Sequence, residues 1–187
     1  MALQDTKSFI LGSGILYLSD FSPETGIPED SVIETEVNKI GNIQGGASLE
    51  YKPESYQVVD DNNMVLDTFI TNEEVIFKSG ILTWTISNLE RIVGAAEVTE
   101  ETSKNLIVIK IGGRGAKGLK STLVRFVHTI KKTGKKLRVT IVGVPSEGFT
   151  LSFDPKSEKT IDAVFTAVPH DEQGTKVIIS KEVQAAE

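Results

Sequence analysis

Apolar and polar residues alternate with a period of two along most of the chain, and this pattern constrains the fold most strongly. In the clearest run, Phe149, Leu151 and Phe153 would line one face of a strand and polar residues the other. Similar runs, rich in Val, Ile, Thr and Phe, cover residues 15–19, 48–51, 64–70, 75–77, 81–86, 105–111, 122–130, 136–142, 160–168 and 176–180. The pattern predicts about ten strands in a mainly β fold, an antiparallel β-sandwich or barrel.

Short turn signals separate the later runs, at residues 132–135, 145–148, 154–157 and 169–174. Such spacing is typical of antiparallel hairpins joined in a meander, which we expect from about residue 122 onward. A chain of 187 residues fits one core of this kind. We therefore predict a single domain over residues 1–187.

One segment carries a helix signal. Ser87 to Glu90 matches a capping box that would start a helix, and Gly94 stands where that helix would end. A helix of about two turns is not stable alone, so it must pack on the sheet. We expect one short helix that flanks the sheet.

Three segments lack both patterns: residues 1–14, 20–31 and 53–63. We expect residues 1–14 to form a flexible N-terminal arm. The third segment contains Asp60, Asp61 and Asn62 between two predicted strands, so it predicts a long loop that leaves the body of the domain. A calcium site there is disfavoured, because Val65 and Thr71 occupy the positions where an EF-hand loop needs glycine and glutamate.

Charge is divided unevenly along the chain. Residues 1–103 hold 5 basic and 18 acidic residues, whereas residues 104–187 hold 15 basic and 8 acidic residues. The two halves could simply mix on the folded surface. Alternatively, an acidic patch on one copy could meet a basic patch on the next copy and fix the register between identical subunits.

Several functional classes are disfavoured by composition. The chain has no cysteine, which excludes disulfides, thiol catalysis and cysteine-ligated zinc. The apolar stretch at residues 9–11 is too short for a signal peptide. We expect synthesis in a bacterial cytoplasm, with no export signal and no membrane anchor.

Residues 113–118 match the G-x-G-x-x-G spacing of dinucleotide-binding turns, but the context fails. A β-branched run follows, and no acidic residue occurs between Glu101 and Glu147. The segment is more simply a flexible hairpin tip, or one that orders against a neighbouring subunit or a polyanion through Arg114 and Lys117. His128 and His170 lack metal-ligand spacing. We predict no catalytic residue, no metal and no cofactor, and hence no enzyme.

A basic cluster, Lys131, Lys132, Lys135, Lys136 and Arg138, spans a predicted turn. Aromatic residues, which binders of single-stranded nucleic acid interleave with their basic residues, are missing from it. An isoelectric point near 5.1 also argues against a dedicated nucleic-acid binder. A contact between subunits is the functional role that we consider for this cluster.

The order of these elements resembles the tail tube (major tail) proteins of long-tailed bacteriophages. Residues 42–51, Asn-Ile-Gln-Gly-Gly-Ala-Ser-Leu-Glu-Tyr, look like that family's strand leading into a long exposed loop. Residues 64–86 look like the returning strand region, and residues 87–94 like its short helix. Residues 149–153, 160–168 and 169–174 look like its terminal strands and final hairpin.

This resemblance implies a structural protein of the virion tail. Family members form hexameric rings that stack into a hollow tube for DNA passage, with tape-measure, terminator and baseplate proteins as partners. The candidate inter-subunit contacts are then Glu54, Tyr56, Asp60, Asp61, Asn62, Arg114, Lys117, Lys131, Lys132 and Lys135. The alternatives are a ring-forming baseplate or tail-terminator protein, a tube protein of a related injection machine, or a ligand-binding β-sandwich.

Overall fold

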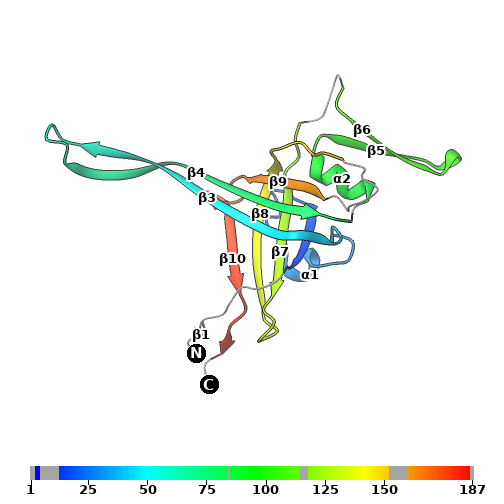
Figure 1. Ribbon diagram of the computed structural model, residues 1–187, viewed down its shortest axis with the longest axis horizontal. Coiled ribbons are helices and arrows are strands. Elements are labelled where there is room, and N and C mark those ends of the chain that lie inside the picture. Colours follow the sequence, from blue (N-terminus) through cyan, green and yellow to red (C-terminus); the bar gives the residue numbers. More distant parts are fainter. Residues whose placement is uncertain (1–2, 5–12, 84, 114–117, 152–159, 186–187) are drawn as a thin grey trace.

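The structure is a computed structural model that describes residues 3–4, 13–83, 85–113, 118–151 and 160–185 (Figure 1). The strands are β1 (Leu3–Gln4), β2 (Ile15–Asp20), β3 (Ile43–Val59), β4 (Val65–Ile81), β5 (Ala96–Glu101), β6 (Leu106–Ile111), β7 (Thr122–Thr129), β8 (Lys136–Pro145), β9 (Ile161–Ala167), β10 (Val177–Lys181) and β11 (Gln184–Ala185). The helices are α1 (Asp30–Ile33), α2 (Ile86–Val93) and the 3-10 turn η1 (Thr102–Lys104). The predicted mainly β, antiparallel fold is confirmed, and the sheet does not close into a barrel.

The main sheet has seven strands. Six follow the order β2-β7-β8-β9-β4-β3, and β10 pairs with β8. β9 and β10 share one edge of β8, since β10 pairs with residues 137–141 and β9 with residues 143–145. The meander is thus confirmed from β7 to β9, while the last strand of the sheet returns to β8.

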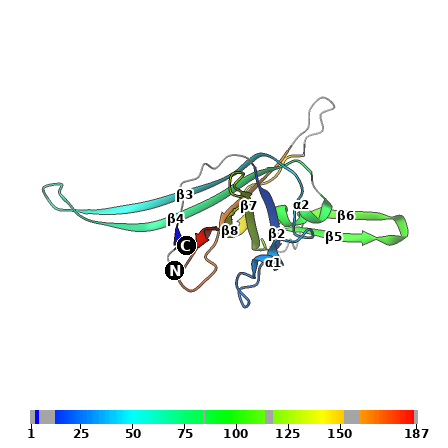
Figure 2. The same cartoon turned by 90° about the horizontal axis from the view of Figure 1, so that it is seen from below.

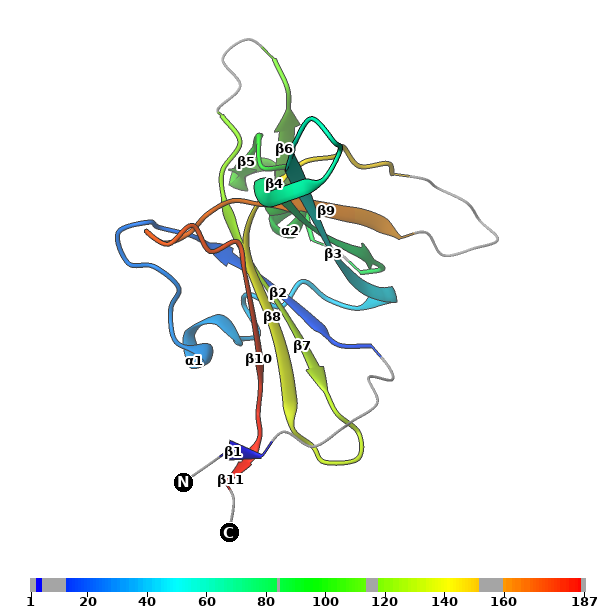
Figure 3. The same ribbon diagram turned by 90° about the vertical axis from the view of Figure 1, so that its left-hand side faces the viewer.

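The strong bend of this sheet creates the main core. Seen from the side to which β3 and β4 project, β9, β4 and β3 cross over β7 and β8 (Figure 3). Leu16 and Val124 from one half pack in a single cluster with Phe77 and Phe165 from the other half. Both phenylalanines are almost fully buried, so one sheet folded over itself provides a sandwich-like interior.

β7 is covered on both faces, because a second and smaller cluster lies behind it. Leu123 and Val127 of β7 pack there with Tyr17 of β2 and Ile33 of α1. The predictions for residues 20–31 did not include α1, which places Ile33 over this face. The body of the protein therefore has two apolar layers, one on each side of β7 and β8.

The predicted helix is confirmed as α2, but its start differs. Thr85 is the N-cap, and its hydroxyl accepts a hydrogen bond from the Asn88 backbone N–H at 3.2 Å, so Ser87 lies inside the helix. Gly94 ends the helix in the left-handed conformation, with φ of 69°. The strand predicted over residues 81–86 is wrong, because β4 ends at Ile81 and α2 begins at Ile86.

The loop predicted over residues 53–63 is also wrong. β3 continues to Val59 and β4 begins at Val65, so most of this segment is a paired strand. Pro53 is tolerated within β3 because β3 is the edge strand of the sheet. Mixed polar residues on both exposed faces conceal the period of two that a half-buried strand would show.

Three further differences concern shorter segments. β5 was not predicted, and β6 pairs with it, so residues 112–113 belong to a connection between two sheets and not to a hairpin tip. Residues 149–151 do not form a strand, and residues 152–154 of that run lie outside the described residues. Of the predicted N-terminal arm, the structure describes only residues 13–14 and β1, which pairs with β11. In the described part of the chain, no helix has the length and apolarity needed to cross a membrane.

Candidate assembly surface

The distal parts of β3 and β4 form a two-stranded projection, which we call the arm (residues 51–75). β3 and β4 pair along their whole length, whereas the pairing of β4 with β9 stops at Ile76. Figures 1 and 2 show the arm extending far from the body along the longest axis of the molecule. An isolated two-stranded hairpin is at best marginally stable in water, so an arm of this length suits an element that packs against a partner.

Large apolar side chains are exposed on the arm. Each of the following is between 50% and 64% exposed: Tyr51, Tyr56, Val59, Met64, Val65, Leu66, Phe69 and Ile70. Tyr56 lies directly opposite Phe69, and Ser55 lies opposite Ile70, so apolar groups occur on both faces of the ribbon. So many exposed large apolar side chains on one short projection are typical of an interaction site.

The tip of the arm is a defined turn. The Asp60 carboxylate accepts hydrogen bonds from the backbone N–H groups of Met64 at 2.8 Å and Asn62 at 2.9 Å. These bonds, that from Met64 foremost, hold the pKa of Asp60 below its usual value. Asn63 adopts the left-handed conformation that the turn requires, with φ of 61°. The acidic tip is thus held in one shape before any partner arrives.

The base of the arm is tied to the body near β10. The Lys176 ammonium donates a hydrogen bond to the Glu73 carbonyl. The Tyr51 hydroxyl donates to the Glu73 carboxylate at 2.5 Å, and this bond raises the pKa of Tyr51. The arm therefore leaves the body in a fixed direction, and its outer part projects beyond the body (Figures 1 and 2).

Acidic residues dominate the arm and its base. Residues 50–75 contain seven acidic residues and one lysine, Lys52, which pairs with Glu50 at 3.2 Å. No ion pair neutralises the carboxylates of Glu54, Asp61, Asp67 or Glu74 within the residues that the structure describes. A surplus of unpaired negative charge is thus presented beside the apolar groups.

The turn between β7 and β8 carries the opposite charge, and we call residues 131–135 the lysine turn. Backbone bonds from Thr133 and Gly134 to the Ile130 carbonyl close it, at 3.1 and 2.8 Å. None of Lys131, Lys132 and Lys135 pairs with a carboxylate in the described part of the chain. Three cations are therefore available to a partner.

The remaining members of the predicted basic cluster, Lys136 and Arg138, are committed to an ion-pair network with a buried centre, formed by Glu34, Arg125 and Arg138. Arg138 Nε contacts Glu34 Oε1 at 2.5 Å, and the Lys136 ammonium contacts Glu34 Oε2 at 2.7 Å. Arg125 binds Asp30 at 2.6 Å, and Arg138 also binds Glu182 at 2.7 Å. The network fastens α1 and the segment after β10 onto the β7–β8 face.

The pKa values of the acidic members follow from these contacts. The hydrogen bond from Arg125 lowers the pKa of Asp30. Burial alone would raise the pKa of Glu34, but the hydrogen bonds from Arg138 and Lys136 outweigh it and lower the pKa. The Lys136 backbone N–H and then Arg138 lower the pKa of Glu182. The network is therefore ionised at neutral pH, and its role is structural.

A second hairpin, formed by β5 and β6, projects in the direction opposite to the arm (Figure 1). Its register places Val98, Ile109 and Ile111 on one face, and Ile111 is half exposed. Sequence reasoning did not identify this projection, because no residue pattern separates it from a strand of the main sheet.

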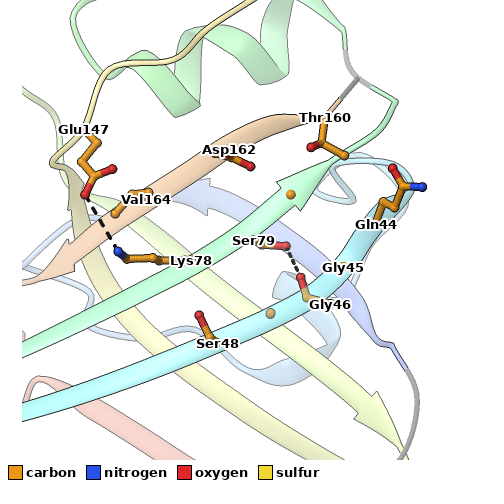
Figure 4. Close-up of a pocket in the computed structure, with 12 residues that line it drawn as sticks. Gln44, Gly45, Gly46, Ser48, Lys78, Ser79, Glu147, Thr160, Asp162 and Val164 are labelled. Carbon is orange, nitrogen blue, oxygen red and sulfur yellow. Dashed lines mark hydrogen bonds and ion pairs between the residues drawn. The ribbon is translucent and has the colours of Figure 1, made fainter. Parts of the chain in front are cut away.

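A shallow polar cavity of about 530 Å³ lies on the outer face of β3, β4 and β9 (Figure 4). Lys78 contacts Glu147 across it at 4.0 Å, and the Ser79 hydroxyl donates to the Gly46 carbonyl at 3.1 Å. These partners use each other, and the cavity is wide open. No cluster of His, Asp or Glu that could hold a metal occurs among the described residues.

The structure gathers the predicted contact residues into two groups. Glu54, Tyr56, Asp60, Asp61 and Asn62 all lie on the arm. Lys131, Lys132 and Lys135 lie together in the lysine turn, at the lower end of the body in Figure 1 and far from the tip of the arm. Arg114 and Lys117 lie outside the described residues. A search against protein families and a search against curated proteins both find no match to this chain.

Proposed function

We propose that this protein is a structural subunit that assembles with copies of itself into stacked rings and forms the tail tube of a long-tailed bacteriophage. The observation that carries the proposal is the arm, whose apolar side chains project into solvent on both faces. The ring number of six, the passage of DNA through the tube and the location in the virion tail come from the family resemblance alone.

The energetics of the arm favour assembly. Fully burying one large apolar side chain contributes about 1.5–3 kcal/mol, and eight such side chains on the arm are at least half exposed in the single chain. Covering several of them against a neighbour supplies several kcal/mol toward association. A monomer that kept this surface in water would gain nothing from it and would risk aggregation.

The sheet edges also suit a closed assembly. Among the described residues, β3 is the last strand of the sheet at one end, and β10 pairs with β8 through one edge and with no strand through the other. Two different free edges on one subunit are suited to head-to-tail contacts, which generate a ring when the rotation closes. Ring closure would cover the edges that otherwise invite uncontrolled pairing.

The acidic surplus is compatible with a conduit for DNA. An inner wall that carries carboxylates repels phosphate, and DNA then slides without sticking. The protein in this proposal performs no bond-making chemistry. It is synthesised in the host cytoplasm and meets tape-measure, terminator and baseplate proteins during assembly.

Electron microscopy of the concentrated protein tests this function. We expect annuli that stack into tubes of uniform width. Rings that never stack would instead indicate a tail-terminator or baseplate ring, and a strict monomer at every concentration and ionic strength would overturn the proposal. Analytical ultracentrifugation of the same samples gives the subunit number.

A further inference from the structure

We propose that the arm of one copy docks on a second copy, along the outer edge of β10 and onto the lysine turn. This inference rests on the proposed self-assembly and names the surface that receives the arm. It joins the two groups of contact residues that a single chain keeps apart.

The receiving surface combines an open strand edge, apolar groups and positive charge. β10 pairs with β8 through one edge, and in the described part of the chain no strand covers its other edge. Ile178 and Ile179 on β10 are 41% and 59% exposed. Lys181 at the end of β10 lies opposite Leu137, next to the start of β8, so the apolar edge leads toward the lysine turn.

The arm carries the matching groups in the same order. Its acidic tip, with Asp60 and Asp61, is followed by the exposed pair of Tyr56 and Phe69. β3 is an edge strand, so its outer edge can also form backbone hydrogen bonds with an open strand edge, as in β-strand addition.

The spacing of the acidic and aromatic groups along the arm agrees with the spacing of the lysine turn and the apolar groups on the receiving surface. Ile179 lies opposite Val139, which is four residues along β8 from Lys135. Tyr56 on β3 precedes Asp60, which lies in the turn after β3, by four residues. Four residues of a strand span about 13 Å in both cases. When the acidic tip meets the lysine turn, Tyr56 is thus level with Ile179.

Charge and apolar surface together favour the arm of a second copy over a nucleic acid as the partner of this surface. The arm presents unpaired carboxylates, and the lysine turn presents three unpaired ammonium groups. The arm extends to one side of the body, whereas the turn between β7 and β8 lies at the lower end of the body in Figure 1, so the contact must form between copies. A nucleic acid would use the lysines but leave the apolar β10 edge uncovered, whereas the arm covers both.

Cysteine cross-linking tests the contact directly, because the natural chain has no cysteine. Full-length Asp61→Cys is mixed with full-length Lys132→Cys under assembly conditions and oxidised. We expect a covalent dimer in the mixture at a yield at least about tenfold above either variant alone. The matched control is Asp61→Cys mixed with Ser103→Cys, which places the thiol on the exposed tip of the β5–β6 hairpin.

Charge exchange provides the second measurement. The arm variant carries Glu54→Lys and Asp61→Lys, and the turn variant carries Lys131→Glu, Lys132→Glu and Lys135→Glu. We expect each variant to need a concentration at least about tenfold higher for assembly than the natural protein. One chain that carries all five changes should assemble at a concentration near that of the natural protein. Asp60 is left unchanged, because its carboxylate shapes the tip.

The outcomes separate the two proposals. If the natural protein assembles while both charge variants assemble equally well, or if the control pair cross-links as strongly as the test pair, the docking surface is overturned and self-assembly stands. Loss of duplex DNA binding in the turn variant, with assembly unchanged, would assign the lysines to nucleic acid and also overturn it. A natural protein that stays monomeric overturns both.

Discussion

Tyr56 and Phe69 lie directly opposite each other on the two strands of the arm, and each ring is more than half exposed. Cross-strand aromatic pairs stabilise a hairpin modestly, by about 0.2–1 kcal/mol. That contribution does not account for two large aromatic groups in water at the far end of a projection. The pair is therefore part of the contact that we propose with a second copy.

Replacing both rings should separate assembly from stability. We expect Tyr56→Ser/Phe69→Ser to raise the concentration required for assembly at least about tenfold, because the buried apolar area at the contact is lost. The free energy of unfolding of the monomer should change by less than about 1 kcal/mol. Sedimentation velocity and urea unfolding measure the two quantities. Val37→Ser, which alters an exposed valine outside the arm, is the matched control and should assemble normally.

Shortening the arm in register should remove assembly and leave the body folded. Replacing residues 55–71 by Asn-Gly joins Glu54 to Asn72, which face each other across the ribbon. The two apolar clusters of the body lie outside the removed segment, so we expect the melting temperature to stay within about 4 °C. Circular dichroism checks the fold. An unfolded product would show that the arm belongs to the cooperative core.

The buried ion-pair network should be sensitive to loss of a single carboxylate. Glu34→Ala leaves the side chains of Arg138 and Arg125 without one of their buried partners, and we expect a loss of about 3 kcal/mol in the free energy of unfolding. Glu36→Ala removes an exposed partner of Lys39 and should cost less than about 1 kcal/mol. Equal effects of the two changes would contradict the structural role of the network.

The same network predicts a pH dependence. Asp30, Glu34 and Glu182 all have a lowered pKa in the folded protein, so the unfolded chain takes up protons first as the pH falls. Their contribution is complete above the unfolded pKa values, near 4 to 4.5, and is lost as the pH falls below them toward the folded values. Urea unfolding between pH 7 and pH 3 should therefore show a steeper decline for the natural protein than for Glu34→Gln.

The start of α2 can be assigned by substitution. Thr85→Ala removes the hydroxyl that accepts from the Asn88 N–H and should destabilise the protein by about 1 kcal/mol. Ser87→Ala changes a residue inside the helix and should leave stability nearly unchanged. Thermal melting of the two variants decides which residue is the N-cap. A larger loss of stability in Ser87→Ala than in Thr85→Ala would assign the N-cap to Ser87.

Sequence reasoning succeeded for strands that lie in the body of the protein. β2 and β7 were predicted from runs rich in apolar and β-branched residues, and Leu16 and Val124 of these strands lie in the main core. It failed on the arm, where residues 65–73 are exposed on both faces and no alternation distinguishes inside from outside. Phe149 and Leu151 show the converse error, since alternation without a neighbouring strand to pair with does not make a strand.

The ion-pair network was missed for a different reason. Asp30 and Arg125 are separated by 95 residues, and only the folded sheet places α1 over β7. Lys136 and Arg138 were grouped with the lysine turn because they are neighbours in the sequence. In the structure, the turn and the network divide the basic cluster into a part that is available to a partner and a part that is already paired.

The shared edge of β8 determines how a mechanical load would travel through the protein. A pull on the arm passes from β4 to β9 and then to β8 through backbone hydrogen bonds, and β10 takes it up from the other half of the same edge. Tension that enters through the projection therefore crosses the whole subunit without leaving the bonded sheet. In a row of subunits joined in this way, each copy would carry the load in series. The β8–β9 pairing has only three residues on each strand and would be the weakest point on this path.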